Sequence, residues 1–351
     1  MDSDQRAFLD ELLETPSPSG YETAGQRVWI DYVSEYADDV RTDDYGNAIA
    51  VLDGSGPEVA VAGHGDEIGF IVRRIDDDGF VHLGPIGGSD KTVSKGQHVT
   101  IHGSDGPVQG VVGQSAIHLR DGDGEVDDIG EQKVDIGVED GDEARDLLEV
   151  GDPITFSSTV EDLQGDRIAA RGIDNRVGTW TAAETLRRAA ERDVDATVYA
   201  VSTVQEELGL RGARMVGFDL NPDAVVAVDV THATDYPGAP GDRGGDVELG
   251  EGPVVGRGSA NHPVVVSEAR AAATEADVDV QLQASGVRTG TDADAFFTAR
   301  DGIPSLNLGL PNRYMHTPVE VVDTRDLDDA ADVLAQFVDR VGDRESFAVD
   351  V

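Results

Sequence analysis

The chain has 351 residues, of which 39% are hydrophobic and 5% aromatic, a composition that fits a folded protein larger than one small core. Its 70 acidic and 27 basic residues give a formal net charge of -43, and only three of the basic residues are Lys. Such a surface repels the phosphates of nucleic acids and anionic membranes, and it is typical of proteins adapted to high salt, which screens the charges. The sequence contains no Cys, which excludes disulfides and thiolate metal sites.

The first part of the chain predicts two helices and two strands. Phe8, Leu9, Leu12 and Leu13 lie at helical spacing and the pattern ends before Pro16, which indicates an amphipathic helix. A second helix and two short strands are expected over residues 21–36, 47–52 and 58–62. The N-terminus has no basic segment followed by an apolar run, and no stretch of about 18 apolar residues occurs, so we expect a cytoplasmic protein.

Residues 68–165 differ from the rest of the chain, because short alternating runs are interrupted there by turn-forming pairs such as Asp78-Gly79 and Asp140-Gly141. This pattern predicts an inserted all-β domain. From residue 166 onward strands and helices alternate, which favours a mostly parallel sheet covered by helices. We expect a helix, three strands and a closing helix over residues 175–190, 196–203, 224–230, 303–308 and 327–341. The predicted organisation is an α/β domain of residues 1–67 and 166–351 that carries the insertion.

Histidine and acidic residues follow the predicted strands at the points where these strands end. They are His64, Glu206, Glu207, Asp229 and His316. In an open α/β sheet, ligands bind in the crevice at the carboxyl ends of the strands, so these side chains are expected to converge. Asp174, where the chain returns to the α/β part and begins a helix, is a further candidate. Each pattern alone has an ordinary alternative, such as a helix N-cap for Asp174 or a turn residue for His316, but the joint arrangement indicates a site.

The charges of these candidates favour two divalent metal ions over one. Asp174, Glu207 and Asp229 supply three negative charges and a bridging hydroxide a fourth, which two divalent ions balance when His64 and His316 are neutral. Two ions that share one carboxylate and one water activate that water and polarise a carbonyl group. Ligands that are all nitrogen and oxygen suit Zn²⁺ or Co²⁺, and Mn²⁺ is an alternative.

The adjacent Glu206 and Glu207 are predicted to have separate roles, because neighbouring residues of an extended chain point to opposite sides. In this interpretation Glu207 binds metal, and Glu206 is the general base that takes a proton from the water and passes it to the leaving amine. Asp66, two residues after His64, is placed to orient that imidazole. The histidines of the insertion are interpreted as surface or interface residues, and His232 as a candidate substrate contact.

Five motifs occur in order along nearly the whole chain. They are Gly63-His64-Gly65-Asp66-Glu67-Ile68-Gly69, Asp174-Asn175-Arg176-Val177-Gly178, Val204-Gln205-Glu206-Glu207-Leu208-Gly209-Leu210-Arg211-Gly212-Ala213, Gly290-Thr291-Asp292-Ala293 and Arg313-Tyr314-Met315-His316-Thr317-Pro318-Val319-Glu320. Together they closely resemble the tetrahedral (TET) aminopeptidases, a family that includes glutamyl and deblocking aminopeptidases. The resemblance implies a zinc-peptidase-like catalytic domain that acts on peptides.

The same resemblance implies a role for each matching position. His64 and Asp229 would hold one metal ion, Glu207 and His316 the other, and Asp174 would bridge the two. The peptide bond after this Asp is expected to be cis, as it is in family members. The insertion would correspond to a PDZ-like dimerisation domain, from which the family builds dimers and then a hollow tetrahedron of twelve subunits.

The sequence therefore predicts a metal-dependent aminopeptidase that removes N-terminal residues from short peptides, with a metal-bridging water and Glu206 as the base. A related two-metal carboxypeptidase or N-acyl amino acid deacylase is the alternative among enzymes, since it needs the same metals. A catalytically silent assembly protein is the alternative of another class. One position departs from the family pattern: Gly65 stands where relatives usually carry a larger apolar residue, which is expected to loosen the loop without removing a ligand.

Overall fold

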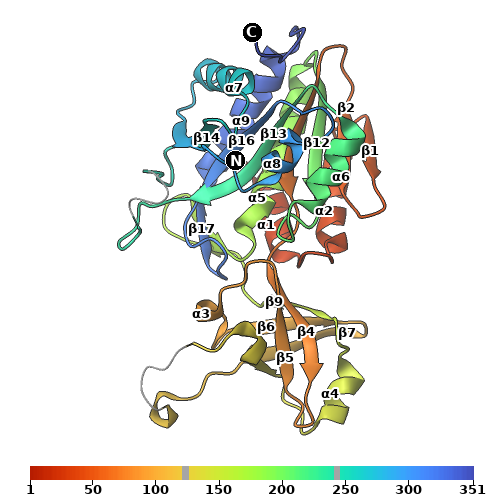
Figure 1. Cartoon of the computed structure of the whole chain (residues 1–351), viewed down its shortest axis with the longest axis vertical. Coiled ribbons are helices and arrows are strands. Elements are labelled where there is room, and N and C mark those ends of the chain that lie inside the picture. The colour runs from red at the N-terminus through yellow and green to blue at the C-terminus, as the bar shows by residue number, and fades with distance from the viewer. Residues whose placement is uncertain (121–125, 241–245) are drawn as a thin grey trace.

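A mixed sheet of eight strands forms the centre of the larger part of the molecule in this computed structural model, which describes residues 1–120, 126–240 and 246–351 (Figure 1). The strands lie in the order β1 (Asp39–Thr42), β2 (Ala48–Leu52), β12 (Thr197–Thr203), β3 (Glu58–His64), β13 (Ala224–His232), β16 (Ser305–Asn312), β14 (Val254–Arg257) and β15 (Gln281–Ala284). The four central strands, β12, β3, β13 and β16, are parallel. The predicted mostly parallel sheet is confirmed in its centre, while antiparallel strands flank it on both sides.

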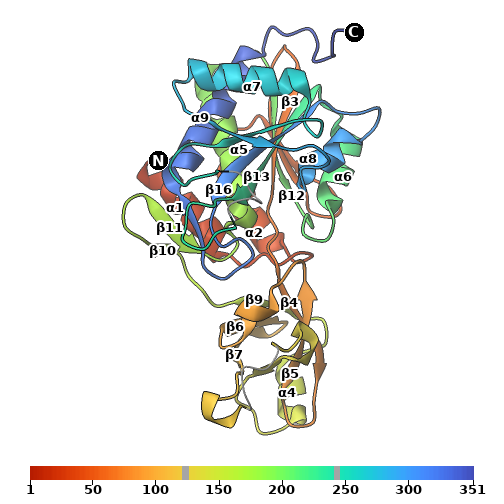
Figure 2. The same ribbon diagram turned by 60° about the vertical axis from the view of Figure 1, so that its left-hand side comes forward.

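Helices cover both faces of this sheet, as the two views in Figures 1 and 2 show. One face is covered by α1 (Ser3–Glu14), α2 (Thr23–Val33), α5 (Ile173–Arg192), α7 (Pro263–Glu275) and α9 (Thr324–Arg340). The other face is covered by α6 (Arg211–Leu220) and α8 (Asp292–Phe297). Trp29, Trp180 and Phe337 are fully buried on the five-helix face. Both strand faces are therefore removed from water, which explains the nearly continuous apolar sequence of the central strands.

The link between burial on both faces and an apolar sequence is clearest in strand β13. Its sequence, AVVAVDVTH, is buried at every position except the last. Asp229 is the only charged side chain within that buried run. Because an ionised carboxylate is costly to bury without compensation, this residue marks a position where charge is needed.

The predicted helix over residues 175–190 is confirmed as part of α5, with Val177, Trp180 and Leu186 fully buried. The strand expected over residues 303–308 begins two residues later and extends to Asn312 as β16. Its continuation includes Pro311, which lies beyond the residues that pair with β14. A residue without an N–H is tolerated in a strand where a neighbouring strand is absent. In the described part of the chain, no helix combines the length and the apolar character that crossing a membrane requires.

Six strands of the middle segment close into a separate barrel, which lies below the large sheet in Figure 1. In barrel order they are β4 (Gly69–Ile75), β5 (Val81–Ile86), β8 (Lys133–Asp135), β7 (Gly106–Val112), β6 (His98–Gly103) and β9 (Pro153–Phe156). Phe70, Leu83, Ile101 and Ile154 are fully buried in a core of its own. The β character of this segment is confirmed, and its likeness to a PDZ domain stays a prediction.

The expectation that this segment is entirely β was wrong, because it also contains short helices. These are α3 (Lys91–Ser94), α4 (Gly141–Leu147) and the 3₁₀ turns η1 (Ile117–Leu119) and η2 (Ile129–Glu131). The pair Asp140-Gly141, interpreted as a turn signal, begins α4: the Asp140 carboxylate accepts hydrogen bonds from Asp142 N and Glu143 N at 2.9 and 3.0 Å. Asp is favoured equally in turns and at helix N-caps, so the pair alone could not separate the two.

The histidines of this segment also need one correction. His82 was interpreted as a surface or interface residue, but its side chain is buried and its Nε2 lies 2.9 Å from a carboxylate oxygen of Asp76. The burial of a histidine in a small barrel is possible because this carboxylate satisfies it.

A third, small sheet belongs to the larger part of the molecule and lies where the chain returns from the barrel. It contains β10 (Glu161–Asp162), β11 (Arg167–Ala170) and β17 (Glu320–Asp323), in that order. The chain leaves the large sheet after β3 and returns through β11. Glu67, which follows β3, connects these two segments, because it binds residues that follow β11. Its carboxylate accepts hydrogen bonds from Arg171 at 2.6 Å and Arg176 at 2.5 Å, and all three side chains are buried.

Candidate metal centre

Two ligand candidates are brought side by side by the register of parallel strands. Ala62 of β3 lies opposite Ala227 of β13. Two residues further along each strand are His64 and Asp229, so both side chains leave the sheet at the same level, at the carboxyl ends of the strands. The predicted convergence at this edge is therefore a direct consequence of strand pairing.

The start of α5 brings Asp174 to the same place. The helix can approach the sheet because β3 has Gly63 where it passes beneath α5: a Cβ there would clash with the backbone of Gly178 and Thr179. The peptide bond between Asp174 and Asn175 is cis, as the family resemblance implied.

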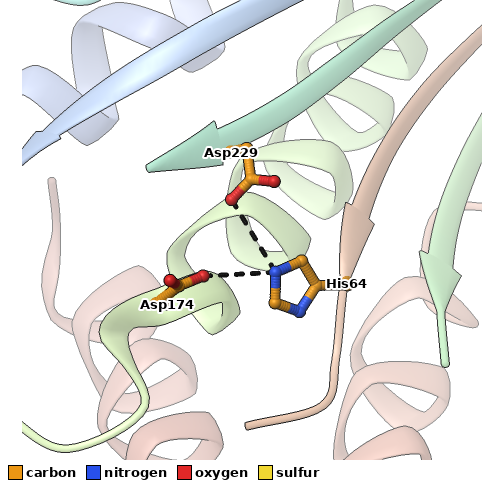
Figure 3. A group of neighbouring side chains, drawn as sticks. All are labelled: His64, Asp174 and Asp229. Carbon is orange, nitrogen blue, oxygen red and sulfur yellow. Dashed lines mark ion pairs between the residues drawn. The ribbon is translucent and has the colours of Figure 1, made fainter. Parts of the chain in front are cut away.

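His64, Asp174 and Asp229 form what we call the inner ligand group (Figure 3). The Nε2 atom of His64 lies 3.2 Å from Oδ1 of Asp174 and 3.7 Å from Oδ1 of Asp229. All three residues are buried, and His64 is only 2% exposed. In Figure 3 one nitrogen of the imidazole faces both carboxylates, one from α5 and one from β13.

A second set, which we call the outer ligand group, consists of Asp174, Glu207 and His316. The Nε2 atom of His316 lies 3.2 Å from Oδ2 of Asp174 and 3.2 Å from Oε1 of Glu207. Glu207 follows β12 and His316 follows β16, both in loops, and the His316 side chain is 33% exposed. Asp174 belongs to both groups and directs a different carboxylate oxygen to each histidine.

The spacing of these atoms fits metal coordination. Ligand atoms roughly 2.0–2.1 Å from a tetrahedral Zn²⁺ ion lie roughly 3.3 Å from one another. Three of the four histidine–carboxylate distances in the two groups are 3.2 Å and the fourth is 3.7 Å. Nitrogen and carboxylate oxygen are also the ligand types that suit Zn²⁺ and Co²⁺.

The electrostatics of the site also favour the binding of cations. Hydrogen bonds with Asp174 and Glu207 raise the pKa of His316 to about 11. Burial raises the pKa of Glu206 to about 10 and holds the pKa of Asp229 well above its usual range. Several buried carboxylates share this space, so the site gains stability from any added positive charge, whether protons or metal cations supply it.

Glu206 belongs to neither ligand group. Its Oε2 atom lies 3.8 Å from Nε2 of His64, and the residue lines the pocket in front of the two groups. The predicted separation of the neighbouring glutamates is thus present in the geometry, with Glu207 facing His316 and Glu206 facing the pocket side of His64. A carboxylate placed beside the ligands can exchange a proton with a molecule bound there.

Asp66 is fully buried behind the site, and its hydrogen bonds differ from the expected one. Its carboxylate accepts from the backbone N–H groups of Glu206 and Glu207, at 3.0 and 3.2 Å, and from the Ser19 hydroxyl at 2.7 Å. The imidazole of His64 is more distant from this carboxylate, at 3.5 Å, and its Nδ1 lies 3.2 Å from the backbone carbonyl oxygen of Asp66. Asp66 therefore positions the loop that carries the two glutamates as well as facing the ring.

The loop around Gly65 is tightly packed, so the expectation that glycine loosens it was wrong. A Cβ at this position would lie 2.8 Å from Oγ of Ser202 and 3.3 Å from Oε1 of Gln26. These two atoms are themselves joined by a 2.6 Å hydrogen bond in which Ser202 donates. The space of a larger residue is occupied here by a buried polar pair.

The two ligand groups open into a pocket of about 450 Å³. His232 lines it, and its role as a substrate contact stays a prediction. Sequence reasoning missed the other wall residues, which include Thr231, Gln283, Ser285, Arg288, Thr289 and Met315. Several of them follow β15, an edge strand whose place beside the site no local pattern indicates.

Two buried acidic residues near the ligands were also missed as functional candidates. Asp292 accepts a 2.6 Å hydrogen bond from the Thr203 hydroxyl, and Glu320 accepts from the backbone N–H groups of Asp174 and His316. Both are 2% exposed. Their position inside the motifs quoted above could have indicated a functional role. An acidic residue is nevertheless difficult to single out in so acidic a chain.

A crevice at the ends of parallel strands that gathers two histidines and several carboxylates is an arrangement that metal-dependent hydrolases use. Residues 46–333 match the family described as M42 glutamyl aminopeptidase, and the chain belongs to this family. It is 36% identical over 328 residues to a lysyl aminopeptidase of Pyrococcus furiosus, covering 92% of this chain and 93% of that protein. The protein is accordingly a peptide hydrolase.

Solved structures of related enzymes share the whole fold. A TET aminopeptidase from a marine sediment archaeon of the Thaumarchaeota superposes with a TM-score of 0.92 at 28% identity, covering 98% of both chains. The Pyrococcus horikoshii TET1 peptidase, which can assemble into a tetrahedron or a large octahedral shell, superposes with a TM-score of 0.84 at 28% identity, covering 95% of this chain and 98% of that one.

Proposed function

We propose that this peptide hydrolase is an aminopeptidase that uses two divalent metal ions, Zn²⁺ or Co²⁺ with Mn²⁺ as an alternative. The observation that supports two ions is the position of Asp174, whose two carboxylate oxygens each lie 3.2 Å from a different histidine. His64 and Asp229 would hold one ion, Glu207 and His316 the other, and Asp174 both. When bound, two such ions lower the pKa of a water molecule between them and polarise the carbonyl group of the substrate.

In this proposal Glu206 is the general base. Its carboxylate lies beside the inner ligand group and lines the pocket, so it can accept a proton from the attacking water and then donate it to the leaving amine. Asp66 supports this role by accepting the Glu206 backbone N–H at 3.0 Å, which fixes the residue relative to His64.

A matched pair of variants tests these roles. Glu206→Gln should retain both metal ions and lose roughly 10²- to 10⁴-fold in kcat, the usual contribution of a general base. Glu207→Gln, the adjacent change, should lose metal from the outer group. Metal content and the hydrolysis rate of aminoacyl fluorogenic substrates, with N-acetylated peptides as the control for a free N-terminus, give both readouts. Loss of metal from Glu206→Gln would mean that the two glutamates have the opposite roles.

We further propose that the enzyme prefers acidic N-terminal residues, on the basis of the charges that line the pocket. Among the residues that the structure describes, every carboxylate that lines the pocket is either Glu206 or a member of the two ligand groups, so none of these is left to bind a lysyl side chain. The wall carries one guanidinium, Arg288, and within the described ranges 1–120, 126–240 and 246–351 it has no carboxylate partner. Arg288→Ala should therefore reduce the rate on glutamyl substrates and spare the rate on leucyl ones. A higher rate on lysyl than on glutamyl substrates in the unmodified enzyme would contradict this preference.

We also propose that the chain forms a homo-oligomer, built from dimers into a particle of twelve subunits. One solved relative, PhTET1-12s, is a dodecamer, and the TET1 peptidase described above can assemble into a tetrahedron. The barrel exposes apolar side chains that water contacts unfavourably, with Ile117, Leu119 and Val150 each at least 68% exposed. Because a net charge of -43 repels neighbouring subunits, the assembly should require salt. Light scattering during dialysis from about 3 M to about 0.1 M KCl should show the particle dissociating before circular dichroism reports unfolding. An unchanged particle at the low end would oppose the salt adaptation.

A further inference from the structure

Glu320 links the backbones of two proposed metal ligands that are far apart in the sequence. Its Oε1 atom accepts the backbone N–H of His316 at 2.8 Å, and its Oε2 atom accepts the backbone N–H of Asp174 at 3.1 Å. The side chain is 2% exposed, so water does not replace these bonds. One carboxylate thus spans two ligand residues that are delivered by different elements.

The small three-stranded sheet explains how Glu320 reaches both. Glu320 is the first residue of β17 and lies opposite Ala170 of β11, four residues before Asp174. Arg313 and Val321 exchange backbone hydrogen bonds at 2.9 and 3.0 Å, which closes the loop that contains His316. The pairing of β11 with β17 therefore fixes the distance between the start of α5 and this loop.

The loop needs such support because its backbone is unfavourable. Tyr314 and His316 both have a φ of 62°, in the left-handed region that residues with a side chain rarely occupy. Conformations of this kind cost of order 1–3 kcal/mol each and persist only where surrounding contacts hold them. The bond from the His316 N–H to Glu320 holds one of these residues directly.

We propose that Glu320 is a positioning residue, which clamps the backbones of Asp174 and His316 so that their side chains are held at the spacing of the outer ligand group. This inference rests on the proposed metal-dependent function. It assigns to Glu320 no contact with metal or substrate; its effect passes through the two residues whose N–H groups it accepts. The affinity for the ion of the outer ligand group should therefore depend on it, whereas the inner group, held by strand ends, should depend on it less.

The test is Glu320→Gln, in which the amide has a single acceptor oxygen and presents an NH₂ group to the second backbone N–H. Asp326→Asn is a matched control, since the Asp326 carboxylate is also buried and accepts two backbone N–H groups, from Gly250 and Gly252 at 2.8 and 2.9 Å. It makes the same kind of clamp away from the ligands. Metal-free protein is titrated with Zn²⁺ against a competing chelator, and the occupied sites are followed with Co²⁺ absorption.

We expect Glu320→Gln to weaken the binding of one of the two ions by roughly 10- to 100-fold, the usual effect of losing a residue that supports a metal ligand. Asp326→Asn should lower only the thermal stability and bind both ions as the unmodified protein does. Equal metal binding by Glu320→Gln and the unmodified protein, or an equal loss in both variants, would overturn the inference. Unmodified protein that binds no metal would instead overturn the proposed function, and the inference with it.

Should Glu320→Gln fail to fold, Glu320→Asp provides the second variant. It keeps the charge but is one methylene shorter, so it can accept from one of the two N–H groups and not from both. Weaker binding of one ion by this variant supports the clamp, and unchanged binding opposes it.

Discussion

The inner and outer ligand groups are built by different means, although they share Asp174. His64 and Asp229 extend from neighbouring parallel strands, and their level is set by the register of β3 and β13. Glu207 and His316 lie in loops, and their backbones are held by hydrogen bonds to buried carboxylates. His64 is 2% exposed, whereas the side chain of His316 is 33% exposed.

Ligand residues can therefore be held in position in two ways, by the register of strands or by hydrogen bonds to the backbone of a loop. Strand register is part of the fold itself, so His64 and Asp229 of the inner group are in place once the sheet has formed. The outer group needs further hydrogen bonds, which act on loops that the sheet leaves free. We therefore expect the inner group to be coupled to global stability, and the outer group to change in metal affinity without loss of the fold.

The largest effect is expected where the two groups meet. Asp174→Ala removes a ligand from both, so both ions should be lost and peptidase activity should fall by more than the roughly 10⁴-fold upper limit for a lost general base. Metal analysis and peptidase rates measure this, with Asp166→Ala as a control, since that carboxylate is 60% exposed. Retention of one tightly bound ion would show that the two groups are independent and do not share this residue.

The next largest effect is expected at the buried ion pairs that Glu67 makes with Arg171 and Arg176. Glu67→Gln leaves Arg171 and Arg176 without their carboxylate partner, which should cost about 3–5 kcal/mol in the free energy of unfolding at pH 7. The pKa of Glu67 is lowered from 4.5 to about 2, despite its burial, by these two guanidinium groups. Its stabilisation is therefore complete above pH 4.5 and is lost as the pH falls toward 2.

The measurement is the difference in unfolding free energy between unmodified and Glu67→Gln protein at several pH values in high salt. This difference should shrink between pH 5 and pH 2.5. A difference that stays constant over that range would show that the ion pairs do not depend on the charge of Glu67.

A smaller effect on stability is expected when either histidine is replaced by Ala, and the two replacements can be compared directly. In metal-free protein, His64→Ala leaves buried carboxylates without a neighbouring cation and should cost about 3 kcal/mol of stability. His316→Ala, at a partly exposed position, should cost about 1 kcal/mol or less. The second variant should still bind one ion at the inner group. Denaturant unfolding and metal titration provide both values, and equal costs for the two would remove the distinction between the groups.

The smallest effect concerns the packing beside the inner group. Gly65→Ala should destabilise the protein by about 1–3 kcal/mol, because the new methyl group would lie 2.8 Å from Oγ of Ser202. Ser202→Ala removes that oxygen, so the double variant should recover part of the loss. A double-mutant cycle measures the coupling, and strictly additive effects would mean that the contact is relieved elsewhere.

Much of the inner ligand group could be predicted from the sequence. Apolar runs locate β3 and β13, and His64 and Asp229 stand at their ends, where a charged residue is costly unless it is used. The outer group was predictable in its residues, since Glu207 and His316 also follow strands, but the loop conformations that orient them were not. The φ of 62° at Tyr314 and His316 could not be read from the sequence, because neither residue is Gly, which adopts such angles most readily.

The sequence by itself determined the order of the central strands and main helices, the six-residue constellation of histidines and carboxylates, and the presence of a β-rich insertion, because each depends on local periodicity or on the nature of single residues. Only the tertiary structure decided what supports that constellation. Glu320 reaches Asp174 through the pairing of β17 with β11, and Arg288 reaches the pocket because β15 lies at the sheet edge near the site. These placements depend on contacts between residues far apart in the sequence: the Asp174–Glu320 hydrogen bond alone joins residues 146 positions apart. The free energy that selects these contacts comes from the packing of the whole sheet and from no single segment.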